Sequence, residues 1–487
     1  MMNCIARFFG RPVILFPCLG IVILGSLCFT GHASAQTPAP AAAPAPAASP
    51  RPPEAPLSAD DVSWLFPTPT KPADLDNLIS MADLTAPNPQ DPAKRDRVWS
   101  DAAFQQFLGI AASPAAIADG DRIGLPAEVK SIDAWRIAGI RFDPGAPGLS
   151  DAIIKQYGQS PQIRLIVQPV TKNADGTLDV HDITAHLIFS FLDPAKPVLD
   201  PAEKGCFPRP VPDLVTFQKI VAEIADLRTR LSEGKLGADK VTTSGKPLGV
   251  HPGLIDPTTA SNVRQEMKAI LERHLSSLRL GQMAIMGLPA DAPEPWIFLS
   301  MLRVQPGDVP QLPNGGYIPV HGPTLDGTQF AQKLEPPGST PRVVPVPHTN
   351  NLAPITCVNA AVPANGPPVK QRHGVSTASL PSDPPKSQSG IRNVLNVLNV
   401  IADPAKSHFF NTDCVSCHTE TRRAMELLRP HDIPKINAAP LPNGPWNVRN
   451  FGWSPLVEGP VHGTVTRRAA AETAAVVDFI NSKMLKK

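Results

Sequence analysis

The sequence predicts an α+β fold for residues 57–304 and an all-α domain for residues 391–487. Three observations predict this division. The front part alternates strand-like segments with helix-like ones, its strand-like segments are joined by Pro and Asp turns, and the C-terminal part is flanked by two amphipathic helical stretches. The mixed order of elements in the front part favours a mixed, largely antiparallel sheet with amphipathic helices.

Strand-like segments are rich in β-branched, aromatic and aliphatic residues. They lie at residues 132–142, 163–167, 183–192 and 296–304. In the third segment the apolar residues alternate with other residues: Ile183, Ala185, Leu187, Phe189 and Phe191. This period of two predicts a half-buried strand with one apolar face.

Two helices are predicted from a period of 3.6 residues. One begins at Asp213 and ends before Gly234; its apolar residues are Leu214, Phe217, Ile220, Val221, Ile224, Leu227 and Leu231. The other begins at Asp256 and ends near Gly281; its buried face is predicted to hold Val263, Met267, Ile270, Leu271, His274 and Leu278.

Residues 1–35 have the layout of a secretory signal peptide. Arg7 and Arg11 are followed by an apolar run at 13–29 and by small residues that end at Ala35. We expect cleavage after Ala35, a mature chain without a transmembrane segment, and a periplasmic or secreted location. An uncleaved membrane anchor is the alternative.

Two segments are rich in proline. Residues 36–56 predict a semi-rigid Pro/Ala linker, and residues 305–390 predict a long irregular segment. In an oxidising compartment the cysteines Cys206 and Cys357 favour a disulfide, with two buried thiols as the alternative.

Charge and motifs exclude several classes of function. The chain has 45 Lys and Arg against 43 Asp and Glu, and no basic patch indicates a nucleic-acid partner. No Gly-rich motif opens a helix, so neither nicotinamide nor flavin binding is indicated. Histidines His181 and His186 lie five apart in strand-like sequence, which predicts opposite faces and structural roles.

The five residues from Cys414 to His418 form the pattern C-x-x-C-H. This pattern is the attachment signature of a c-type haem. The two cysteines lie on one helical turn, where each can form a thioether with a haem vinyl group. His418 then presents its imidazole to the iron as the proximal ligand.

Residues 391–487 resemble a class I c-type cytochrome domain. An apolar helix (Val394, Leu395, Leu398, Ile401) precedes the signature, Phe410 stands four residues before Cys414, and an amphipathic helix at 471–487 carries Phe479. The resemblance implies one covalent haem c and single-electron exchange with a periplasmic redox partner.

The sequence departs from this resemblance at the distal iron ligand. No methionine lies between Met425 and Met484, and the loop where one is expected contains His462 instead. We expect His462 as the sixth ligand, with His431 and Met484 as alternatives. A surface histidine beside five-coordinate iron is a further possibility.

The loop after the signature helix is rich in aromatic residues. Trp446, Arg449 and Trp453 are candidates to wall the haem, with Trp446 or Arg449 donating hydrogen bonds to its propionates. The alternative is a loop whose aromatic residues pack against the terminal helix.

Three functions stay open from the sequence. The leading expectation is electron transfer by an exported monohaem cytochrome. The alternatives are a haem-containing subunit or active centre of a small-molecule oxidoreductase, and a haem-based sensor. The front domain shows no catalytic spacing, which favours a docking or structural module. Whether the chain is an enzyme stays open from the sequence.

Overall fold

The structure is a computed structural model. It describes residues 56–88, 90–114, 122–146, 148–151, 154, 159–193, 211–288, 290, 297–304, 306, 312, 314–320, 322–323, 329–334, 343–346, 380–381, 383–407, 412, 414–428, 449–454 and 461–485. The predicted signal peptide, nearly all of the predicted linker, and the cysteines Cys206 and Cys357 lie outside these residues. Residues from 53 onward belong to one compact unit.

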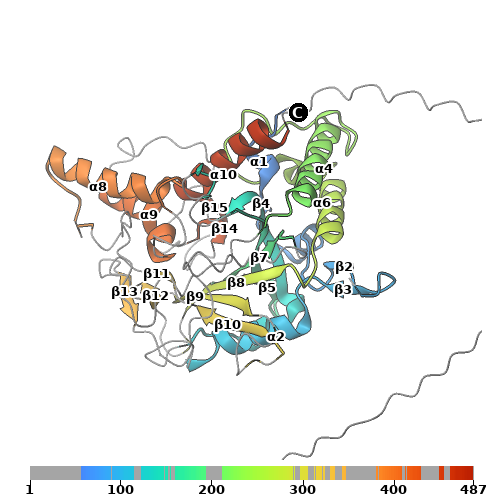
Figure 1. Ribbon diagram of the computed structural model, residues 1–487, viewed down its shortest axis with the longest axis horizontal. Helices are drawn as coiled ribbons and strands as arrows, with labels where there is room; N and C mark the ends of the chain where they lie inside the picture. Colours follow the sequence, from blue (N-terminus) through green and yellow to red (C-terminus); the bar gives the residue numbers. More distant parts are fainter. Residues whose placement is uncertain are drawn as a thin grey trace, which may run out of the picture. The chain divides into compact units, whose positions relative to one another are not determined.

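The described chain contains an antiparallel sheet of eleven strands, and the prediction of a mixed α+β fold with a largely antiparallel sheet is confirmed. Eight strands follow one another in the order β1 (Ser63–Leu65), β4 (Trp135–Ala146), β5 (Ser160–Lys172), β7 (Thr184–Ser190), β8 (Leu280–Gly287), β9 (Ile297–Val304), β12 (Gln329–Leu334) and β11 (Gly322–Pro323). Three more pair with members of this path: β6 (Leu178–Val180), β10 (Gly316–Val320) and β13 (Val343–Val346). Figure 1 shows this sheet between two sets of helices.

Two hairpins lie outside the large sheet. They are β2 (Thr85–Pro87) with β3 (Arg95–Arg97), and β14 (Phe451–Ser454) with β15 (His462–Val465). The α-helices of the described chain are α1 (Ala59–Val62), α2 (Asp101–Ala111), α4 (Leu214–Ser232), α5 (Pro252–Ile255), α6 (Ala260–His274), α8 (Gln388–Ala402), α9 (Cys414–Leu427) and α10 (Arg467–Phe479). Short 3-10 turns cover Pro72–Asn77, Ala127–Lys130 and Ile132–Ala134, and Ile480–Met484 forms a π turn.

Strand β7 has two different faces, as its alternation predicted. The five alternating apolar residues of the predicted face, from Ile183 to Phe191, are all buried. At the end of β7, Phe191 contacts Phe217 of α4 in an edge-to-face arrangement, with ring centroids 5.8 Å apart. The opposite face carries Thr184, His186, Ile188 and Ser190, which line a cavity. One face therefore belongs to the core and the other to a cavity.

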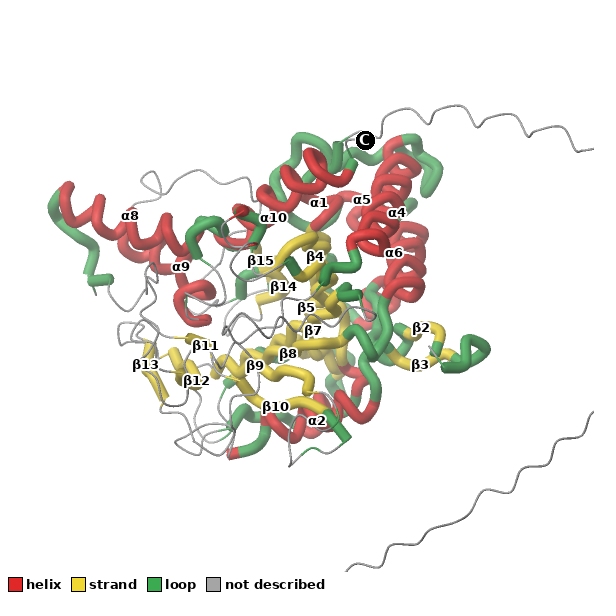
Figure 2. The backbone as a smooth tube through the Cα atoms, viewed as in Figure 1, coloured by secondary structure: helices red, strands yellow, loops and turns green. Residues whose placement is uncertain are grey.

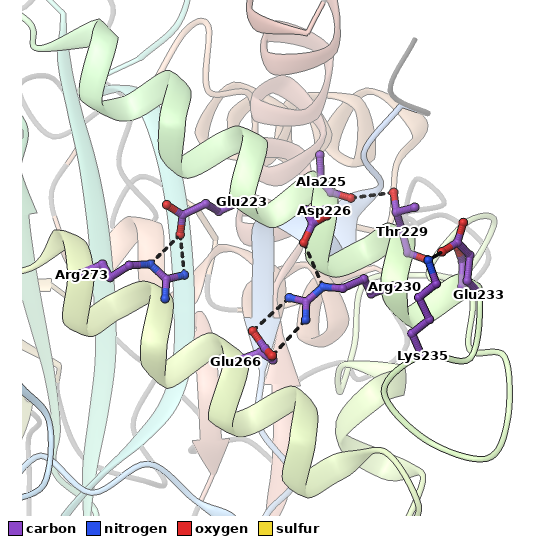
Figure 3. A network of polar contacts seen from close by, with 10 residues as sticks. Glu223, Ala225, Asp226, Thr229, Arg230, Glu233, Lys235, Glu266 and Arg273 are labelled. Atoms are coloured by element: carbon purple, nitrogen blue, oxygen red, sulfur yellow. Dashed lines mark hydrogen bonds and ion pairs between the residues drawn. The ribbon is translucent and has the colours of Figure 1, made fainter. Parts of the chain in front are cut away.

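Helices α4 and α6 run side by side on one side of the sheet, and Figure 2 shows α8 and α9 on the other side. Arg230 of α4 makes a two-pronged ion pair with Glu266 of α6, at 2.9 and 3.0 Å. Glu223 and Arg273 form a second link between the two helices, as Figure 3 shows. The side chain of Asp213 caps α4 as predicted, by accepting from the Thr216 amide at 3.1 Å.

The second predicted helix is shorter than expected. It ends at His274, because the chain turns there and enters β8 at Leu280. Leu278 was predicted to be buried, but it lies in this turn and is 58% exposed. The prediction for Leu278 was wrong, since the helical period does not extend into the turn.

The C-terminal residues share their core with the sheet. Trp453 of β14 is fully buried, and its indole nitrogen donates to the carbonyl oxygen of Phe66 at 2.9 Å. Gln168 of β5 both donates to the Trp453 carbonyl and accepts from the Trp453 amide. Because this region contains the β14–β15 hairpin, the structure does not show the predicted separate all-α haem domain.

Helices α8 and α9 have a smaller apolar cluster of their own. It contains Leu380, Val394, Leu398, Ala424, Leu427 and Leu428. The predicted domain boundaries at residues 304 and 390 stay predictions. Among the described residues, no helix has the length and apolar character needed to cross a membrane.

The Gln168→Ala variant tests how firmly the C-terminal hairpin is joined to the sheet. Substitution leaves both the amide and the carbonyl of Trp453 buried without these partners, so we expect the free energy of unfolding to fall by about 2–4 kcal/mol. Urea unfolding measures the change. The exposed helix variant Gln265→Ala is the control and should change the free energy by less than about 0.5 kcal/mol. An equally small change in Gln168→Ala would contradict the observed packing.

Candidate functional site

The three signature side chains of α9 open onto one cavity. Cys414, Cys417 and His418 all line a space of about 990 Å³. Positions three and four apart lie on the same face of a helix, whereas Ser416, on another face, is fully buried. The C-x-x-C-H spacing therefore aims both sulfurs and the imidazole into the same space.

The cavity lies against the polar face of the sheet. Its floor includes Gln162, Arg164, Thr184, His186, Ala284 and Phe298, which come from four neighbouring strands. Helix α10 supplies another wall, with Arg468, Glu472 and Phe479. Elements from the front and from the C-terminal part of the chain thus enclose one site.

Two histidines lie close to each other in this cavity. The ring centroids of His186, on β7, and His418, on α9, are 6.4 Å apart, with 70° between the ring planes. Phe298 of β9 lies beside His418, with ring centroids 4.9 Å apart. Burial lowers the pKa of His186 well below its ordinary value, and the positive charge of Arg164 lowers it further. His186 is therefore neutral at neutral pH.

Three arginines gather on the same cavity wall. Arg141 and Arg164 stand directly opposite each other on β4 and β5, an arrangement that is unfavourable for like charges. Arg468 of α10 joins them, and Glu472 contacts both Arg141 and Arg468. Burial alone would raise the pKa of Glu472, but the three arginines outweigh it and hold this pKa well below its ordinary value.

Several buried donors of this wall have no hydrogen-bond partner among the described residues. They are Nε of Arg141, Nε of Arg164 and Nε2 of Gln162. Burial lowers the pKa of Arg164, and the nearby Arg141 lowers it further. Unsatisfied donors beside closely spaced positive charges are costly unless an anion accepts from them. The wall is therefore suited to bind a carboxylate.

The other predicted site residues lie in different parts of the structure. Arg449 lines the same cavity, where its Nε donates to Thr184 and its terminal nitrogen pairs with Asp182. Trp453, which belongs to β14, packs within the large core and does not line the cavity. Phe410, Trp446 and His431 lie outside the described residues.

His462 lies away from the signature side chains. It is in β15 and lines a second cavity, of about 870 Å³, which shares no lining residue with the first. The structure therefore does not bring His462 together with His418, and its role as an iron ligand stays a prediction. The alternative ligand Met484 packs against the large core from the terminal π turn.

Sequence reasoning missed His186 as a candidate site residue. The available signal was the alternation of β7, which puts His186 on the face opposite to Ile183 and Leu187. Knowing which face is polar does not reveal what covers it. Only the packing of α9 over the sheet brings His186 to His418, which is 232 positions later in the chain.

The residues of the first cavity fit a haem. Its volume lies within the range of about 300–1,000 Å³ typical of cofactor sites. It combines two cysteines, an imidazole beside them and unsatisfied donors for carboxylates. The described residues contain no group of three or more His, Cys, Asp and Glu side chains placed to hold a bare metal ion. A porphyrin supplies four ligands itself, so two imidazoles suffice for its iron.

No protein family, curated protein or solved structure matches this chain.

The second cavity contains a carboxyl group with a raised pKa. The pKa of Asp60 is raised to about 7, mainly by burial and also by the negative charge of Asp61. The Gly249 amide, which donates to Asp60 at 3.2 Å, and the charge of Lys246 act in the opposite direction. Folding therefore binds a proton at Asp60 over part of the pH range.

The Asp60→Asn variant tests this site through the pH dependence of stability. The Asp60 carboxyl loses its proton near the ordinary pKa of 3.8 in the unfolded chain and near 7 in the folded chain. Between these values the wild-type chain loses stability as the pH rises, whereas asparagine has no proton to lose. The free energy of unfolding of Asp60→Asn relative to wild type should therefore rise by about 2–4 kcal/mol from pH 4 to pH 7.

Thermal or urea unfolding at several pH values measures this difference. Asp239→Asn, at an exposed position, is the control for the general effect of removing one carboxylate. A difference between Asp60→Asn and wild type that stays constant over this pH range would contradict the burial of a protonated Asp60.

Proposed function

We propose that this chain is an exported c-type haem protein that transfers single electrons. One haem c is held in the cavity between α9 and the sheet. The observation that carries the proposal is that Cys414, Cys417 and His418 open onto one cavity of suitable size, whose walls also provide a second imidazole and donors for carboxylates.

The signature residues attach and orient the cofactor. Cys414 and Cys417 would hold the haem through thioethers from their sulfurs, and His418 would supply an imidazole ligand to its iron. When bound, the haem supplies a one-electron couple between ferrous and ferric iron. Helix α9 packs on α8 through an apolar cluster that includes Leu398 and Ala424.

The arginine wall receives the propionates. Arg141, Arg164 and Gln162 each have a buried nitrogen that can donate to a carboxylate oxygen. An anion at this position relieves the repulsion between Arg141 and Arg164 that the cross-strand pairing imposes. The same charges stabilise the reduced form, because an added electron is attracted by nearby positive charge.

The remaining walls include apolar side chains. Ala284 and Phe298 of the sheet and Phe479 of α10 provide apolar surface for the macrocycle. A buried haem that exposes only an edge favours outer-sphere electron transfer to a docked redox partner. The signal-like residues 1–35 support export to a compartment where covalent haem attachment takes place.

Paired serine substitutions of Cys414 and Cys417 test the attachment. With both thioethers removed, we expect no covalent haem in protein exported from a host that matures c-type cytochromes. Intact mass and haem staining of a denaturing gel measure this. The control is Met425→Ala, at a position on the same helix that is 42% exposed, and it should keep its haem. A wild-type protein that matures without covalent haem would contradict the proposal.

The Arg164→Met variant tests the propionate wall. Removal of one positive charge near the haem should lower the midpoint potential by roughly 30–70 mV, as expected for a charge about 10 Å away at an effective dielectric constant near 20. Potentiometric titration measures it. Arg273→Met removes a charge from the α4–α6 pair, which does not line the cavity, and should leave the potential unchanged. Equal potentials in Arg164→Met and wild type would show that the propionates lie elsewhere.

A further inference from the structure

We infer that His186 of β7 is the distal axial ligand, so that the sheet of the front domain and the signature helix each hold the haem iron from one side. This inference rests on the proposed function and adds to it the second ligand and the role of the front domain.

The backbone fixes His186 at the centre of the sheet. Strand β7 is paired on both sides, and His186 lies opposite Ile166 of β5 and Ala284 of β8. Its side chain points to the cavity face, between Thr184 and Ile188. A ligand on a doubly paired central strand is held rigidly, because its backbone cannot shift without breaking the ladder on both sides.

The distance between the two imidazoles matches bis-imidazole coordination. A bond between a metal ion and an imidazole nitrogen is about 2.0–2.1 Å long, and ring bonds of about 1.33 Å put the nitrogen about 1.1 Å from the ring centroid. Two imidazoles on opposite sides of one iron therefore have centroids roughly 6.2–6.4 Å apart. The observed separation of His186 and His418 is 6.4 Å.

The orientation of the rings is also compatible with shared coordination. Their planes are 70° apart, and each axial imidazole is free in principle to take its own angle about its bond to the iron. Phe298 packs beside His418 and limits the rotation of that ring. The protein thus holds two steeply inclined imidazoles at the centroid separation expected for two ligands of one metal ion.

Other candidate ligands in the described chain are placed less favourably. His462 lines the second cavity. His274 is hydrogen-bonded to Glu223, and His251 is stacked on Trp64. Met286 is the one sulfur ligand besides the two cysteines among the residues that line the first cavity; it lies on β8 opposite Thr184. The experiment therefore includes both His462 and Met286.

The assignment gives the front domain a chemical role. A second imidazole donates more strongly than a thioether and lowers the reduction potential relative to a His/Met haem. It also fills the sixth position, which favours electron transfer over binding of small molecules at the iron. Finally, the haem joins α9 to β7, so that the front domain and the signature region depend on each other for a complete iron site.

The experiment uses the full chain, matured with haem in the periplasm, as wild type and as the variants His186→Ala, His186→Met, His462→Ala and Met286→Leu. We expect ferric wild type to be low-spin without the methionine-to-iron charge-transfer band. His186→Ala should become high-spin and bind carbon monoxide when reduced, and added imidazole should restore the low-spin spectrum. His186→Met should gain the charge-transfer band. The His462 and Met286 variants should keep the wild-type spectrum.

Two sets of results would overturn the inference. One is a low-spin spectrum in His186→Ala together with a high-spin spectrum in the His462 or Met286 variant; the other is high-spin iron in the wild type. If the His186 variants do not mature, electron paramagnetic resonance of the wild type decides. Nearly perpendicular imidazoles give a strongly anisotropic low-spin signal, and a high-spin signal or a His/Met signal contradicts the inference. Absence of covalent haem in the wild type would instead contradict the proposed function.

Discussion

The first turn of α10 helps to hold the site together, because it links the signature helix α9 to α8. Arg467 forms an ion pair with Glu420 of α9 at 3.1 Å and donates to Asn399 of α8 at 2.6 Å. Arg468 donates to the Ile401 carbonyl and to Glu472. Later in the same helix, Thr473 is within hydrogen-bond distance of Ser63 of β1. One helix therefore sets the position of the signature helix over the sheet.

These contacts specify an arrangement more than they add stability. Arg467 and Glu420 are both buried, and burial raises the pKa of Glu420 although the charge of Arg467 opposes this. A buried ion pair gains little net free energy, since desolvation offsets the attraction, but a misplaced helix would leave both charges unpaired. The alignment of α9 with the polar face of the sheet follows from this constraint.

Much of the sheet could be predicted from the sequence, because its signals are local. The alternation from Ile183 to Phe191 and the cap at Asp213 depend on neighbours in the chain, and both were confirmed. The hairpin at 451–465 could not be predicted in the same way. Gly452 has a φ of +146°, and a Cβ there would lie 2.7 Å from Oε1 of Gln168. That requirement comes from a strand nearly 300 residues earlier.

The candidate site also combines residues that local sequence predicts with residues that only long-range packing brings together. The C-x-x-C-H motif fixes three residues of the site through helix geometry alone. His186 belongs to no sequence motif. Its role as a site residue could not be predicted, because it depends on which helix covers β7. The same holds for Arg141 and Arg164, which are separate surface-like charges in the sequence and neighbours only in the sheet. Position on a shared cavity wall turns them into a site for carboxylates.

In the proposed haem protein, the haem lies between α9 and the sheet. Hydrogen exchange followed by mass spectrometry tests it most directly, by comparing the haem-loaded chain with the chain in which Cys414 and Cys417 are serines. If the haem bridges the two elements, loading should slow exchange both in α9 and at the amides of β7 and β5 that border the cavity. Slower exchange confined to α9 and α8, with β7 unchanged, would contradict the account.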